Sequence, residues 1–123
     1  MLVKNPRKLV QLNQLTMMKR ANGAPFTLMR MGQAHLALWS NTQSAFHYKT
    51  RNPELLVFSP VLAASPSGQK NLADSQRDDM GLWLLTESNR AHFSDGRRIC
   101  WKEIESLLPA SPSNKEQTRP IVW

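Results

Sequence analysis

Short apolar segments, separated by glycine, proline and polar residues, occur along much of this chain and predict short β-strands. Segments 26–31 and 34–39 flank the dipeptide Gly32-Gln33, a two-residue connection that suits a tight β-hairpin. Residues 81–86 form another short apolar run of the length typical of a strand. The pattern therefore predicts at least three strands at these positions.

Two further strands are expected between these segments. Residues 46–51 alternate with a period of two, which places Phe46 and Tyr48 on one face of a strand. Residues 55–62 form the second strand, and Pro60 cannot donate a hydrogen bond to a neighbouring strand. We therefore expect the later half of this second strand at a sheet edge or in a bend. The opposite face of the first strand carries His47, Lys49 and Arg51.

The last ordered segments are predicted to be a hairpin and a short helix. Segments 89–94 and 97–101 flank Asp95-Gly96, a dipeptide typical of tight β-turns. Residues 101–108 have the apolar spacing of a short helix, and Pro109 ends it.

The N-terminal segment, residues 5–23, begins and ends with residues typical of helix termini. Asn5 suits the cap, Pro6 the first turn and Gly23 the end. Its apolar residues recur every third position, however, which is shorter than the helical repeat of 3.6. An extended arm over residues 8–17 is the competing interpretation.

The chain is predicted to be a single α+β domain over residues 1–109. We expect a small antiparallel sheet or open barrel of five to seven short strands, with an N-terminal and a C-terminal helix. Residues 65–80 are rich in serine, glycine and charge and are expected to form a mobile loop. Residues 110–123 are expected to form a flexible C-terminal tail.

The positive charge of the chain is concentrated at its beginning. The formal net charge is +7, and the first acidic residue is Glu54. Eight lysines and arginines precede it, whereas eight basic and nine acidic residues share the remainder. Because clustered cations repel one another, this asymmetry favours an anionic partner.

We therefore expect a non-enzymatic nucleic-acid-binding or accessory protein whose N-terminal half contacts the phosphates of DNA or RNA. Lysine and arginine attract phosphate, and aromatic rings stack on unpaired bases. The candidate residues are Lys4, Arg7, Lys8, Lys19, Arg20, Arg30, Trp39, His47, Tyr48, Lys49 and Arg51.

Two other functions compete with this one. An adaptor or inhibitor, of the type carried by phages or plasmids, would bind an acidic protein and dock through the apolar tail residues Ile121, Val122 and Trp123. A metal-independent ribonuclease of toxin type would use histidine as its base, and His35, His47 and His92 are available.

Cysteine, metal and membrane signals are sparse. Cys100 is the only cysteine, so no intrachain disulfide can form and a reducing, cytoplasmic location is expected. Beside Trp101, Cys100 is predicted to be a small core residue. Histidine and cysteine lack the spacing of a metal site, and no cofactor is expected. Apolar runs are far shorter than the roughly 20 residues of a membrane span.

Overall fold

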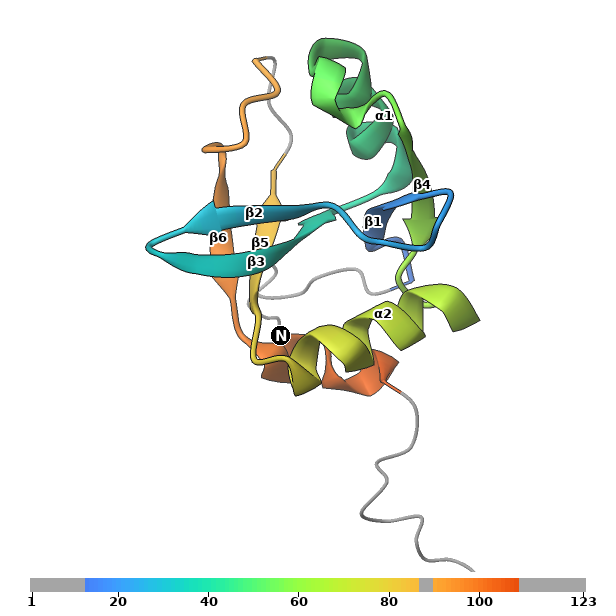
Figure 1. The fold of residues 1–123 in the computed structure, drawn as a ribbon, viewed down its shortest axis with the longest axis vertical. Helices are drawn as coiled ribbons and strands as arrows, with labels where there is room; N and C mark the ends of the chain where they lie inside the picture. The colour runs from blue at the N-terminus through green and yellow to red at the C-terminus, as the bar shows by residue number, and fades with distance from the viewer. Residues whose placement is uncertain (1–12, 87–89, 109–123) are drawn as a thin grey trace, which may run out of the picture.

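The computed structural model describes residues 13–86 and 90–108 (Figure 1). These residues form six strands and two α-helices, together with single 3-10 turns. The strands are β1 Thr16–Arg20, β2 Thr27–Arg30, β3 Gln33–Trp39, β4 Phe58–Leu62, β5 Gly81–Leu85 and β6 Gly96–Ile99. The helices are α1 Thr42–Arg51 and α2 Pro66–Arg77, and the 3-10 turns are η3 Pro53–Leu55, η4 Trp101–Glu103 and η5 Glu105–Leu107.

The six strands form one open sheet in the order β4-β1-β3-β5-β6, and β2 pairs with the first half of β3. The predicted α+β class and strand number are confirmed. One pair differs from the antiparallel expectation: β3 and β5 run parallel, because the chain between them crosses over through α1, β4 and α2. No helix in the described part of the chain is long and apolar enough to cross a membrane.

The β2–β3 hairpin forms where the sequence predicts it, with a shift of one residue in its turn. Arg30 pairs with Gln33, so the two turn residues are Met31 and Gly32. Both have positive φ, 54° and 74° respectively, as a type I′ hairpin turn requires. The tip of this hairpin projects at the left of Figure 1.

The predicted N-terminal helix is wrong for residues 16–20, which form β1; residues 5–12 lie outside the described residues. Four consecutive side chains, Leu15 to Met18, are fully buried. β1 lies between β4 and β3 and is covered on both faces, so its apolar residues show no alternation. The extended alternative over 8–17 is correct for Thr16 and Met17.

The predicted strand at 46–51 is wrong, because these residues belong to helix α1. Asn41 caps the helix, and its side-chain oxygen accepts a hydrogen bond from the Ser44 amide at 2.7 Å. Ala45 and Tyr48 lie on the buried side, three residues apart, while Phe46 is half exposed. The alternation of six residues was therefore too short to distinguish a strand from a helix.

The predicted mobile loop at 65–80 is also wrong, since helix α2 occupies most of it. Ser65 caps α2 by accepting a hydrogen bond from the Gly68 amide at 3.1 Å. An added Cβ on Gly68 would lie 2.2 Å from the backbone oxygen of Leu62. Small residues thus let the helix contact the neighbouring backbone directly, and Leu72 is its only large buried side chain.

The C-terminal part of the described chain departs from prediction in two ways. Residues 90–94 form no strand; β6 pairs with β5 instead, with Gly96 opposite Leu85. The predicted helix at 101–108 is replaced by the successive turns η4 and η5, which place Ile104 in the core. Pro60, as predicted, lies in the edge strand β4.

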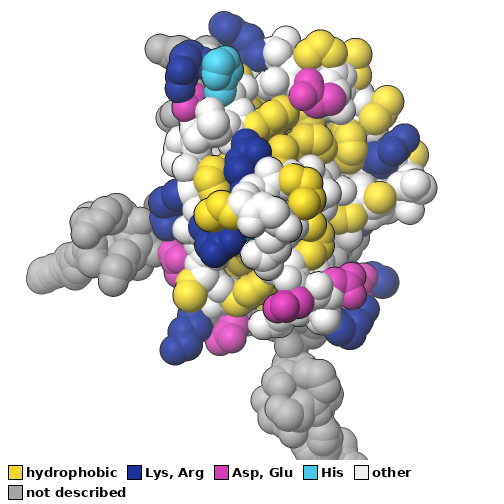
Figure 2. Space-filling model, turned by 60° about the vertical axis from the view of Figure 1, so that its left-hand side comes forward, with side chains coloured by type: hydrophobic (Ala, Val, Ile, Leu, Met, Phe, Trp, Pro, Cys, Tyr) yellow, Lys and Arg dark blue, Asp and Glu magenta, His cyan; other side chains and the backbone are white. Residues whose placement is uncertain are grey.

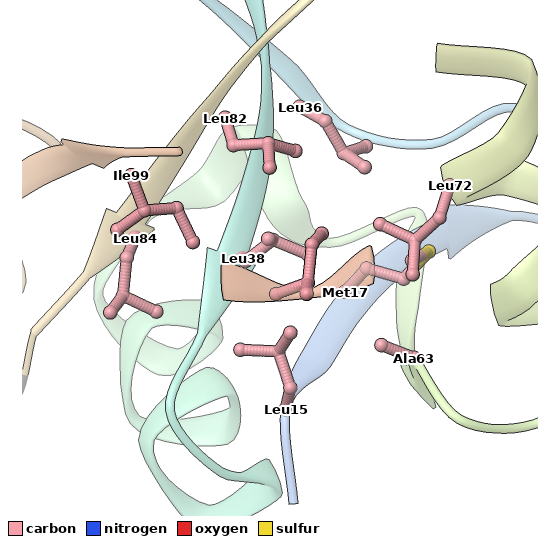
Figure 3. Close-up of a cluster of buried hydrophobic side chains, with 10 residues drawn as sticks. Leu15, Met17, Leu36, Leu38, Ala63, Leu72, Leu82, Leu84 and Ile99 are labelled. Carbon is pink, nitrogen blue, oxygen red and sulfur yellow. The ribbon is translucent and has the colours of Figure 1, made fainter. Parts of the chain in front are cut away.

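The sheet separates two hydrophobic clusters. The first, shown in Figure 3, contains Leu15, Met17, Leu36, Leu38, Ala63, Leu72, Leu82, Leu84, Ile99 and Ile104, and it lies between the sheet and α2. The second contains Met18, Ala37, Trp39, Ala45, Tyr48, Leu55, Phe58, Leu85 and Ala91, and it lies on the α1 side. Partly buried Phe26, Leu28, Trp83 and Phe93 border the second cluster.

Candidate functional site

Two arginines lie on the sheet face that carries the second cluster. Strand register places Arg30 opposite Gln33, and Trp83 between Ala37 and Arg98. Directly paired residues project to the same side of a sheet, so these side chains share one face. We call the group formed by Arg30, Gln33, His35, Trp83 and Arg98 the arginine site.

Arg98 is held in place by a buried histidine. Its Nε lies 3.2 Å from Nε2 of His35, and its Nη2 lies 3.2 Å from Oε1 of Gln33. The His35 ring is fully buried, and its Nδ1 is 2.9 Å from the Gln33 backbone oxygen. Because arginine can only donate, Nε2 accepts and the ring proton is assigned to Nδ1, where it is donated to Gln33.

Arg30 is positioned by Trp83. The guanidinium carbon lies 5.2 Å from the centre of the indole ring, within the range of a cation–π interaction. The indole itself is fixed, because its Nε1 donates a 2.9 Å hydrogen bond to the Phe93 backbone oxygen. Trp83 and His35 also pack with their rings nearly perpendicular, at a centroid distance of 6.0 Å. Arg30 and Arg98 therefore each contact one of two rings that pack against each other.

Neither arginine of this site has an ion-pair partner within residues 13–86 and 90–108. Each ion pair of these residues uses a later cation: Lys70 and Arg77 with Asp74, Arg90 with Asp95, and Arg97 with Glu103. Arg97 is the immediate neighbour of Arg98 on β6. Of these two adjacent arginines, the structure pairs one with a carboxylate and leaves the other available to an external anion.

Glycine makes the close packing of this site possible. Gly81 faces His35 across the β3–β5 pair, and a Cβ on it would lie 2.5 Å from Cδ2 and 2.6 Å from Nε2 of the imidazole. Only glycine leaves room for the buried ring that holds Arg98.

The cations predicted from the N-terminal half do not form one patch. Figure 2 shows Lys and Arg side chains spread over the visible face, among hydrophobic and acidic ones. Arg20 lies over the Phe58 ring at 5.8 Å, and Lys49 donates to the Phe58 backbone oxygen at 2.7 Å. These two cations form a second group beside β4, whereas Arg30 belongs to the arginine site.

The other residues predicted to contact nucleic acid lie away from the arginine site and from one another, or outside the described residues. Lys19 is on β1, and Arg51 is exposed at the end of α1. His47 and Lys49, expected on one face of a strand, are two positions apart on helix α1 and so project in widely different directions. Lys4, Arg7, Lys8 and the tail residues Ile121, Val122 and Trp123 lie outside the described residues.

Trp39 and Tyr48 cannot serve as stacking platforms, because both are fully buried. Their rings pack edge to face at 5.8 Å inside the second cluster. The Tyr48 hydroxyl donates to the Thr86 backbone oxygen at 2.8 Å, and burial raises the pKa of this tyrosine to about 12. The two rings stabilise the core beneath the surface.

The sequence interpretation missed Arg98, Gln33 and Trp83. Arg98 lies in the charge-balanced later part of the chain, and 63 residues separate it from His35. Its one local signal was the Arg97-Arg98 doublet, which on a strand places one arginine on each face.

The histidine, acidic and cysteine side chains do not come together in the described structure. The described residues contain no group of three histidine, cysteine or acidic side chains able to hold a metal. The histidines lie on separate elements: His35 on β3, His47 on α1 and His92 before β6. Cys100, expected in the core, is exposed at the start of η4.

A cavity of about 430 Å³ lies between residues 22–25 and α2. Asn22, Asn71, Asp74, Ser75 and Asp78 are among the residues that line it. Lys70 and Arg77 bind Asp74 and hold the pKa of its carboxyl below the ordinary value. Asn22 and Asn71 hydrogen-bond to the backbone of residues 23–24, and Asp74 is paired with Lys70 and Arg77, which leaves the arginine site as the better candidate.

No protein-family model, curated protein or solved structure matches this chain. The function is therefore inferred from the geometry of the arginine site.

Proposed function

We propose that this protein binds nucleic acid without catalysing a reaction, and that Arg30 and Arg98 contact its phosphates. The observation that carries the proposal is the pair of guanidinium groups on one sheet face, both lacking a carboxylate partner in the described chain. Each is oriented before a ligand arrives, Arg30 by Trp83 and Arg98 by His35. Preorganised guanidinium groups lose less entropy when they bind phosphate.

The test is a titration with a fluorescent oligonucleotide at two salt concentrations. Contact of Arg30 and Arg98 with one phosphate each should contribute between about −1.4 and −1.8 to the slope of log affinity against log salt. Arg98→Ala should weaken binding by about tenfold or more, because a charge-assisted hydrogen bond contributes about 1.5–3 kcal/mol. Arg97→Ala is the matched control: it removes the same charge from the adjacent residue, where Glu103 already binds it. Equal effects of both variants would contradict the proposal.

An N-terminal contribution is tested separately. Replacing Lys4, Arg7 and Lys8 together by alanine should reduce the salt slope by up to about 0.7–0.9 per lost phosphate contact. An unchanged slope would show that Lys4, Arg7 and Lys8 do not contact phosphates.

A second candidate is an adaptor that binds an acidic protein. Exposed apolar side chains favour it: Phe46 is 50%, Leu56 67% and Val57 62% accessible. Nucleic-acid binding does not require these residues, whereas protein interfaces commonly use them. If Phe46→Ser or removal of residues 121–123 abolishes capture of a partner while oligonucleotides fail to bind at low salt, the adaptor replaces the first proposal.

A further inference from the structure

A series of ring contacts, completed by one hydrogen bond to a backbone oxygen, connects the two groups of cations. Arg20 lies over Phe58, and Phe58 meets Phe26 edge to face at a centroid distance of 5.2 Å. Phe26 then contacts Phe93 at 5.3 Å. The Phe93 backbone oxygen in turn accepts a hydrogen bond from Nε1 of Trp83, and the Arg30 guanidinium lies over the Trp83 ring. We call Phe26, Phe93 and Trp83, with Arg20 and Arg30 at the two ends, the aromatic strip.

The rings of the strip are partly exposed and rigidly supported. Phe26, Phe93 and Trp83 each retain some solvent contact, unlike the fully buried Trp39 and Tyr48. Tyr48 stacks beneath Phe93 at 6.1 Å, and Trp39 packs against Phe26 at 6.4 Å. These partly exposed rings therefore have fixed orientations, so little conformational entropy is lost when a planar ligand stacks on them.

We propose that the ligand is single-stranded nucleic acid, with unpaired bases on the aromatic strip and phosphates at its ends. This inference rests on the proposed function and specifies its ligand. Base–aromatic stacking requires an exposed base face, which a single strand offers and an intact duplex conceals.

The distribution of charge also disfavours a duplex. Tight duplex binding draws on a broad surface that neutralises about 6–10 phosphates. Here the two cation groups are separated by rings: Arg20 and Lys49 beside Phe58, and Arg30 and Arg98 beside Trp83. Alternation of rings and cations is typical of proteins that bind single strands.

The experiment compares an oligothymidylate with a duplex of equal length. Wild-type protein should bind the single strand more tightly. Phe93→Leu, which keeps an apolar side chain but removes the ring, should weaken single-strand binding at least fivefold, since stacking on a base contributes about 1–3 kcal/mol. Phe46→Leu is the matched control, because Phe46 is an exposed ring on α1 outside the strip, and it should leave binding unchanged.

A second variant covers the case in which Phe93→Leu fails to fold. Arg20 is exposed on β1, and Arg20→Ala should weaken oligothymidylate binding, whereas Arg77→Ala on α2 should not. Equal or tighter binding of the duplex overturns this inference. So does wild-type affinity of a folded Phe93→Leu variant or, where that variant does not fold, of Arg20→Ala.

The two proposals fail in distinguishable ways. If Arg98→Ala weakens binding to both ligands equally while Phe93→Leu has no effect, nucleic-acid binding stands and the single-strand inference is wrong. If Arg98→Ala changes neither affinity, the proposed function itself is wrong.

Discussion

Nε of Arg98 lies 3.2 Å from Nε2 of His35, so a cation on the outer strand β6 is bound to an imidazole buried in the middle of the sheet. Arg98 nevertheless remains exposed to solvent, where its guanidinium can meet a ligand. It also satisfies a buried acceptor, which is costly to leave without a partner. Arg98 thus has both a structural role and, in our proposal, a binding role.

This contact predicts energetic coupling between the two residues. Arg98→Ala should destabilise the fold by about 1–3 kcal/mol because Nε2 loses its donor. In the His35→Leu background, which has no such acceptor, the same substitution should cost less. A double-mutant cycle measured by urea unfolding should yield a coupling energy of at least about 0.5 kcal/mol. Additive effects would show that the contact contributes little in solution.

Gly81→Ala should destabilise the protein by about 1–3 kcal/mol, the usual cost of overpacking a core. The added Cβ would meet the His35 ring 2.5 Å away, and neither strand can move without disturbing the β3–β5 pairing. The penalty should shrink in the His35→Ala background, where the ring is absent. Thermal unfolding of the wild type, the two single variants and the double variant measures these penalties. An equal penalty in both backgrounds would mean that the added Cβ does not clash with the His35 ring.

Stability should fall at alkaline pH because of Tyr48. Burial, followed by the nearby Asp95 carboxylate, raises the pKa of this tyrosine from 10.0 to about 12. The unfolded chain therefore releases the proton first. Below pH 10 the protonated Tyr48 hydroxyl contributes its full share to the stability of the fold. Between pH 10 and 12 the free energy of unfolding should drop by up to about 1.4 kcal/mol per pH unit.

Tyr48 is the only tyrosine, so an absorbance titration of tyrosinate reports on it alone. Tyr48→Phe is the control: it should lose about 1 kcal/mol at neutral pH, with the hydrogen bond to Thr86, and should lack this alkaline decline. A midpoint near 10 in the folded protein would contradict the burial of the hydroxyl.

The start of α1 depends on Asn41, whose side chain accepts the Ser44 amide. Asn41→Ala should cost about 1 kcal/mol, whereas Asn41→Asp keeps an acceptor and should be nearly neutral. Chemical denaturation compares the variants, and backbone chemical shifts report whether residues 42–51 are helical. Extended shifts over this segment would restore the strand that the alternation predicts.

Elements with strong local signals could be predicted from the sequence. The β2–β3 hairpin and β5 appear where expected, to within one residue at the turn, because tight turns and short apolar runs depend on neighbouring residues. The edge position of Pro60 follows in the same way from its missing amide hydrogen. The excess of cations in the first half is likewise a property of sequence alone.

The tertiary structure decided the rest. β1 is buried on both faces and α2 packs through Gly68, so neither shows the periodicity that identifies an isolated strand or helix. The arginine site depends on the parallel β3–β5 pairing and the β5–β6 register, which bring Arg98 to His35 from 63 positions away. Such long-range pairing arises from the burial of both sheet faces, a property of the whole chain that no local pattern contains.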